Sequence, residues 1–150
     1  MSVEVFNESS VALDLEEFTQ FADYVLEQMH VGSGVELSVM FIDPEPMEQL
    51  HLQWLELPGP TDVMSFPMDE LRPGTPHQPT AEGVLGDVCI CPQVAEQQAK
   101  DAGHSAVEEM LLLEVHGILH LLGYDHVEKD DEKVMFELQR KLLLTFLAQK

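Results

Sequence analysis

The chain has 150 residues, the size of one ordinary domain, and its 45% apolar and 23% charged residues are typical of a folded globular protein. Seven Lys and Arg against 28 Asp and Glu give a net charge of −21, so the average surface repels nucleic acid and anionic lipid. Any nucleic-acid role must then depend on a local site. The acidic N-terminus does not resemble a signal peptide, and the most apolar stretch, 110–123, is too short and too polar to cross a bilayer. We therefore expect a cytoplasmic protein without membrane contacts.

Alternating and helical patterns of apolar residues predict strands and helices that are mixed along the whole chain. Strands are predicted over 2–7, 36–42, 63–66 and 84–91, and helices over 14–29, 44–55, 93–102, 106–122 and 130–147. A proline-rich stretch, 71–83, is predicted to be a loop. The expected fold class is α/β (α+β), with residues 1–150 forming one domain. Its small mixed four-stranded sheet packs against helices, with a central helix over 106–122.

The two cysteines, Cys89 and Cys91, lie two positions apart in a predicted strand. Both side chains then point to one face, and a reducing cytoplasm disfavours a disulfide. A zinc site of the four-cysteine type would need a second pair, which the chain lacks. We expect them to be small apolar strand residues.

Three histidines near the end of the predicted central helix form the most informative pattern in the chain. His116 and His120 are four apart and therefore project from one face of a helix. Gly123 can adopt the left-handed conformation that turns the chain back, and His126 follows three residues later. Three imidazoles at one point are typical of a catalytic zinc site with one open position. We predict one Zn²⁺ per chain, held by His116, His120 and His126.

The same histidine spacing occurs in the metzincin peptidases, whose motif is His-Glu-x-x-His-x-x-Gly-x-x-His. Those enzymes need the glutamate after the first histidine as a general base. Here that position is Gly117, which cannot accept a proton. A metallopeptidase is therefore the least favoured hypothesis.

The segment His116-Gly-Ile-Leu-His-Leu-Leu-Gly-Tyr-Asp-His126 resembles the signature of the YbeY family of rRNA maturation factors. Pro60-Thr-Asp-Val-Met-Ser-Phe-Pro67 and Gly86-Asp87 are similar to two further blocks of that family. The resemblance implies an α/β domain with a mixed sheet and a zinc held by the three histidines. It also implies a metal-dependent endoribonuclease in small-subunit rRNA processing and quality control. Implied partners are rRNA, the small ribosomal subunit with one of its basic proteins, and a ribosome-assembly GTPase.

The chain departs from the family pattern just before Pro60. The family typically has Tyr-Arg at the positions of Trp54 and Leu55. An arginine there would suit a substrate phosphate, because its planar fork pairs two oxygens. Either Arg72, the only basic residue nearby in sequence, or the metal takes over this contact, or cleavage is weak. We interpret Trp54 as a core residue of an amphipathic helix rather than a surface that stacks bases.

Two further residues, Asp125 and Ser65, are candidate catalytic side chains around the metal. Asp125 adjoins His126, although a turn carboxylate bonded to backbone amides is the more common role. Ser65 could meet a phosphate, and Asp87 could orient a ligand imidazole. Glu114, two residues from His116, should face away from the metal as a solvated or capping acid. The remaining histidines should be surface or packing residues: His30, His51, His77 and His104.

The resemblance, together with the predicted histidine site, implies a zinc-dependent, single-strand-specific endoribonuclease that acts on rRNA in the cytoplasm, at the 3′ end of 16S rRNA. The main alternative is a ribosome-assembly factor that does not catalyse a reaction and whose metal is structural. The net charge of −21 favours this alternative more than usual.

Overall fold

The computed structural model describes residues 2–57 and 59–149. Within these residues every predicted strand and helix is present, and each end lies at most one residue from the prediction. The elements in chain order are β1 (Ser2–Asn7), α1 (Leu15–Gln28), β2 (Val35–Phe41), α2 (Pro44–Leu55), β3 (Val63–Pro67), β4 (Gly83–Ile90), α3 (Pro92–Ala102), α4 (Ala106–Leu121) and α5 (Lys129–Ala148).

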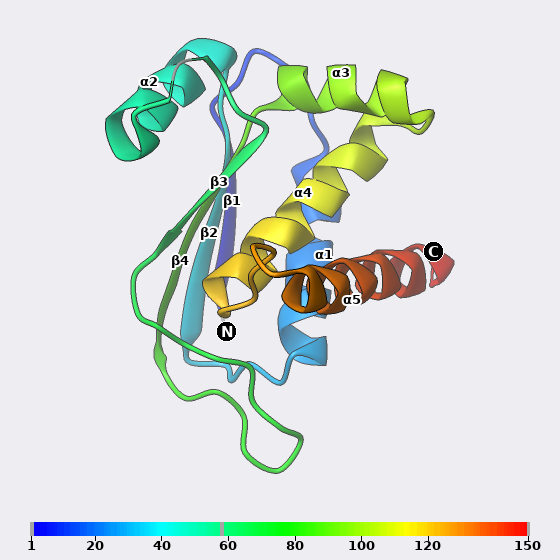
Figure 1. The fold of residues 1–150 in the computed structure, drawn as a ribbon. Helices are drawn as coiled ribbons and strands as arrows, with labels where there is room; N and C mark the ends of the chain where they lie inside the picture. Colours follow the sequence, from blue (N-terminus) through cyan, green and yellow to red (C-terminus); the bar gives the residue numbers. More distant parts are fainter. Residues whose placement is uncertain (1, 58, 150) are drawn as a thin grey trace.

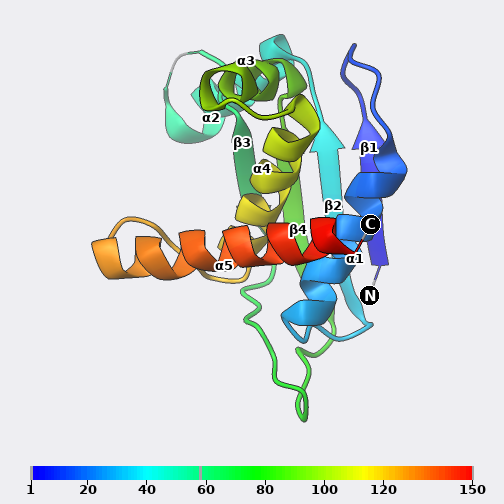
Figure 2. The same ribbon diagram turned by 90° about the vertical axis from the view of Figure 1, so that its right-hand side faces the viewer.

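The four strands form one mixed sheet, as the sequence predicted, and their order in it is β1-β2-β4-β3. Strands β1, β2 and β4 are parallel, whereas β3 pairs antiparallel with β4 and forms an edge. Helices α1, α4 and α5 lie on one side of the sheet, and α2 lies on the other side near one end (Figure 1). Figure 2 shows α4 running along β4 and β3, with α5 crossing it. The edge strand β3 therefore stands between α4 and α2.

The main core fills the space between the sheet and helices α1, α4 and α5. Alternate residues of β2 point into this core. Aromatic rings also pack against one another in it: the ring centroids of Phe18 and Phe41 are 4.7 Å apart. A smaller apolar cluster lies under α2 on the opposite side and contains Ile42, Met47, Met64, Cys89 and Cys91. The two cysteines are free and buried, as expected, and burial raises the pKa of Cys89 to about 11. No helix in the described part of the chain is long and apolar enough to span a membrane.

Two predictions about the burial of individual side chains were wrong. In both cases the burial depends on which neighbouring elements pack against the helix that carries the residue. Glu114 is fully buried, because α4 is surrounded by α1, α3, α5 and the sheet. Its carboxylate oxygens have no hydrogen-bond partner among the described residues, and burial raises its pKa well above the usual range. Trp54 is not a core residue: α2 buries only Met47, and the Trp54 side chain is 60% exposed.

Candidate functional site

The three predicted metal ligands converge at the C-terminal end of α4. His116 and His120 are one helical turn apart, and the helix ends where the Gly123 amide donates to the His120 carbonyl at 3.0 Å. Gly123 has a φ of +98°, a backbone conformation that side chains disfavour, and it turns the chain so that His126 faces the helix. The ring centroids are 5.2–5.3 Å apart, and one ligand atom from each ring lies within 4.8 Å of the others. The predicted triad is thus assembled.

The side chain of Arg72, from the proline-rich loop, lies against Gly123. A Cβ atom at position 123 would lie 2.6 Å from Nε of Arg72, but this exposed, flexible side chain can move away, so the positive φ is what favours glycine there. The sequence singled out Arg72 as the nearest basic residue, and the structure brings it against the turn that separates His120 from His126.

Gln139 is a residue of the site that the sequence analysis missed. Its Oε1 accepts a hydrogen bond from Nδ1 of His116 at 3.1 Å, which leaves Nε2 of that ring free to bind a metal. Gln139 is buried on the apolar face of α5, in the stripe that contains Met135, Leu142 and Phe146. A polar residue in a buried stripe needs a partner, and this could have been read from the sequence.

Two of the three imidazoles, those of His116 and His120, favour the neutral form that metal binding requires. Burial lowers the pKa of His116, and the bond to Gln139 offsets this only in part. Burial, together with the neighbouring rings of His116 and His126, also lowers the pKa of His120. Both rings are therefore neutral near pH 7, and neutral imidazole is the form that binds zinc.

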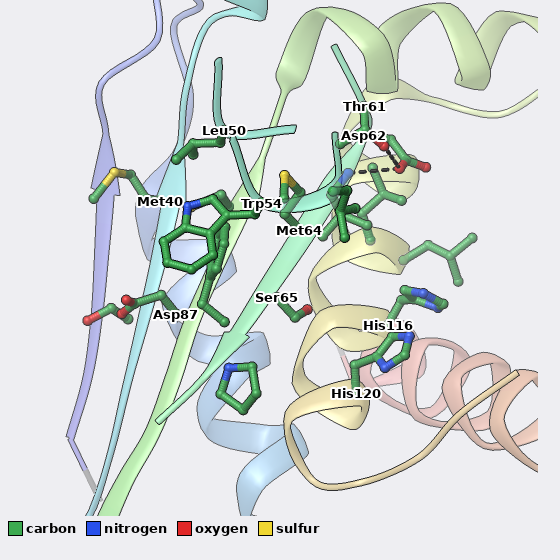
Figure 3. A pocket seen from close by; sticks show the side chains of 18 of the residues that line it. Met40, Leu50, Trp54, Thr61, Asp62, Met64, Ser65, Asp87, His116 and His120 are labelled. Atoms are coloured by element: carbon green, nitrogen blue, oxygen red, sulfur yellow. Dashed lines mark hydrogen bonds between the residues drawn. The ribbon is translucent and has the colours of Figure 1, made fainter. Parts of the chain in front are cut away.

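The histidines open into a hollow of about 1240 Å³ that extends over the edge strand β3 towards α2. One part is lined by His116, His120, His126 and Ser65, and the other by apolar side chains that include Trp54 and Phe66. Figure 3 shows Ser65 between the Trp54 indole and the rings of His116 and His120. The described lining includes Asp62 and Asp87 but no Lys or Arg. The three candidate metal ligands are therefore accessible. Because no Lys or Arg lines the hollow among the described residues, an anion would be attracted there mainly by a cation bound to the histidines.

The structure places the other three candidate residues at different points around the histidines. Ser65 lines the hollow, and its hydroxyl donates to the Gly117 carbonyl at 3.2 Å. Asp125 accepts from the backbone amides of His126 and Val127 at 2.6 and 3.2 Å, which is the turn role considered for it. Asp87 lies on the far side of the hollow from His116 and His120, so it does not orient either imidazole as considered (Figure 3).

Comparisons with known proteins agree with this geometry. The family model described as Endoribonuclease YbeY matches residues 4–147. A protein named Endoribonuclease YbeY from Beutenbergia cavernae is 62% identical over 148 residues, which is 99% of both chains. One of the same name from Bifidobacterium longum is 58% identical and covers 99% of this chain and 81% of its own. The solution structure of a Thermotoga maritima protein superposes with a TM-score of 0.66 at 28% identity, covering 94% of this chain and 86% of that one.

The chain belongs to the YbeY family. The resemblance inferred from the three motifs is thereby confirmed, and so is the α/β fold with its mixed sheet. The signature histidines are the group of described residues suited to hold a metal ion.

The YbeY signature differs from the metzincin motif at Gly117, and the structure gives the physical reason. A Cβ atom on Gly117 would lie 2.6 Å from Cγ1 of Val88, because α4 packs closely against β4 at this point. The position that carries the peptidase base in metzincins thus faces the sheet here, and a glutamate would not fit. This close packing removes the remaining support for the metallopeptidase hypothesis.

The two residues that replace the usual YbeY Tyr-Arg both line the hollow. Trp54 is 60% and Leu55 56% exposed, and both belong to the last turn of α2. Position 55 therefore faces the space in which an arginine would meet a phosphate. With leucine there, this contact is absent from the described hollow.

Proposed function

We propose that this chain is a zinc-dependent, single-strand-specific endoribonuclease that matures and checks small-subunit rRNA in the cytoplasm, acting at the 3′ end of 16S rRNA. The observation that carries the proposal is the triad of His116, His120 and His126, which faces an open hollow in a chain of the YbeY family. Structural zinc sites are usually closed by four protein ligands, whereas catalytic sites keep one position open. Three ligands beside an open hollow fit the second type.

Each residue of the site has a definite task in this proposal. One zinc ion per chain, bound by the three imidazoles, would act as a Lewis acid and lower the pKa of a water molecule in its open position. Gln139 holds His116 in the tautomer whose Nε2 faces the site. Asp125 fixes the turn that carries His126. The Ser65 hydroxyl, on the wall of the hollow, would turn from the Gly117 carbonyl to donate to a phosphate oxygen.

The charge of the chain indicates how substrate would reach this site. At −21 and with no Lys or Arg in the described lining of the hollow, the protein should bind free RNA weakly. A basic protein of the small ribosomal subunit would complement the acidic surface and place the rRNA end at the histidines. A ribosome-assembly GTPase is a second proposed partner. We expect slow cleavage of free RNA and faster cleavage in assembled subunits.

The same lack of positive charge favours one other candidate function. A ribosome-assembly factor that binds the subunit through proteins would not need cationic contacts to RNA, and its metal would only stabilise the end of α4. The exposed His126 is less consistent with this role, because a structural site gains stability from being closed.

A complementation experiment separates the two functions. His126→Ala is expressed in cells that lack the endogenous protein, after thermal unfolding has shown that the variant is folded. We expect small-subunit rRNA to keep its immature 3′ end with the variant and to mature with the wild type. Normal rRNA ends in cells that carry the folded variant would show that the assembly-factor function is correct.

A further inference from the structure

The side of the hollow that lies beyond β3 has no task in the cleavage chemistry described so far. It is formed mainly by apolar side chains, and it includes Trp54 on the last turn of α2. The indole contacts Phe66 at 5.8 Å between ring centroids with the ring planes 66° apart, and 60% of the side chain remains exposed. An exposed tryptophan beside a candidate active site is unusual, because burying an aromatic ring is strongly favourable.

The position of this aromatic pair relative to the histidines limits what it can bind. Both groups line one continuous hollow, and β3 contacts each of them: Ser65 bonds the Gly117 carbonyl of the histidine helix, and the next residue, Phe66, contacts the indole. A chain that enters the hollow to reach the histidines would cross β3 and meet Trp54. The ligand at Trp54 is then a neighbouring part of the substrate.

The charge of the residues that line the hollow determines which part of the substrate Trp54 and Phe66 can bind. The described lining contains two aspartates, Asp62 and Asp87, and no Lys or Arg, so it offers no cationic side chain to pair with phosphates on this side. A nucleobase, in contrast, has an uncharged apolar face that stacks on an aromatic ring. Base stacking is also tolerant of sequence, which suits single-stranded RNA.

We propose that Trp54, supported by Phe66, stacks a base of the substrate strand next to the nucleotide whose phosphate faces the histidines. This inference rests on the proposed function, since it takes RNA as the ligand. It makes Trp54 a substrate-binding residue that compensates for the missing phosphate contact at Leu55. Binding at this subsite depends on stacked bases and only weakly on salt.

The chain offers a direct probe, because Trp54 is its only tryptophan. The zinc-loaded protein is titrated with a short single-stranded RNA and, separately, with an abasic ribose-phosphate oligomer of the same length. We expect saturable quenching of tryptophan fluorescence by the RNA and none by the abasic oligomer. Equal quenching by both oligomers, or none by either, would overturn the proposal.

Variants test the same contact by the anisotropy of a labelled RNA. Trp54→Leu should weaken binding about 5- to 150-fold, the loss of one stacked base, whereas Trp54→Phe should retain most of the affinity. Leu52→Ala is a matched control, since Leu52 is an exposed apolar residue of α2 that is not part of the hollow. Unchanged affinity in a folded Trp54→Leu protein would contradict the proposal.

The outcomes distinguish this inference from the proposed function. If Trp54→Leu cleaves and binds like the wild type while His126→Ala is inactive, the nuclease function stands and the stacking subsite is wrong. If RNA quenches Trp54 but His126→Ala still cleaves, the subsite stands and the catalytic assignment is wrong. Quenching by a basic small-subunit ribosomal protein but not by RNA would overturn the inference and identify the hollow as a protein-binding site.

Discussion

Gln139 Oε1 and His116 Nδ1 are 3.1 Å apart, and this hydrogen bond links α5 to the candidate metal ligands of α4. Removing such a partner typically lowers metal affinity about 10- to 100-fold. We predict that Gln139→Leu weakens zinc binding by that amount, measured by competition with a chromogenic chelator. Gln139→Glu keeps an acceptor for the same N–H and should retain the affinity. Equal zinc affinity in wild type and the leucine variant would show that this bond does not orient His116.

Gly117 lies where α4 packs closely against β4. Replacing it with alanine therefore has two opposing effects on the free energy of unfolding. Alanine in a helix interior gains about 1 kcal/mol over glycine, whereas overpacking costs about 1–3 kcal/mol. A contact of 2.6 Å with Val88 favours the second effect. We predict that Gly117→Ala lowers the free energy of unfolding in urea. Adding Val88→Ala should recover part of the loss, and the absence of any such coupling would argue against the clash.

Glu114 makes stability depend on pH. Burial raises its pKa, so the folded protein keeps a proton that the unfolded chain releases above its usual pKa of about 4.3. Stability is then lost as pH rises above that value, by about 1.4 kcal/mol per pH unit until the folded pKa is reached. We predict that Glu114→Leu stabilises the protein more at pH 8 than at pH 5 in urea unfolding. The exposed Glu137→Leu should show no such difference, and a gain for Glu114→Leu that is independent of pH would refute the explanation.

Leu55 occupies the position of the usual YbeY arginine and lines the hollow. Leu55→Arg should strengthen binding of single-stranded RNA, because one charge-assisted contact contributes about 1.5–3 kcal/mol at best. The slope of log K against log salt should steepen by about 0.7 for the added phosphate contact. Leu52→Arg is a matched control, since Leu52 is equally exposed, at 56%, on the same helix but is not part of the hollow. The same gain in both variants would indicate a general charge effect.

The sequence predicted those features that depend on local pattern. The strands, the helices and the convergence of His116, His120 and His126 follow from periodicity, from helical spacing and from a glycine at the turn. Features that depend on what covers a helix could not be predicted in the same way. Glu114 is buried because five elements surround α4, and Trp54 is exposed because α2 covers only one end of the sheet. Gln139 falls between these cases, because its place in an apolar stripe was visible but its partner, 23 residues away, was not.

The most direct test of the catalytic assignment is a zinc titration of the metal-free protein with a precursor of the small-subunit rRNA 3′ end in assembled subunits. We predict that cleavage appears on zinc addition and saturates at one equivalent per chain. His120→Ala, which lacks one of the three ligands, should neither bind that equivalent nor cleave. Zinc binding should also raise the melting temperature of the wild type but not of the variant, since the ion stabilises only the folded site. Cleavage that proceeds in the presence of a chelator, or that persists in folded His120→Ala, would contradict the assignment of the three histidines as the catalytic metal site.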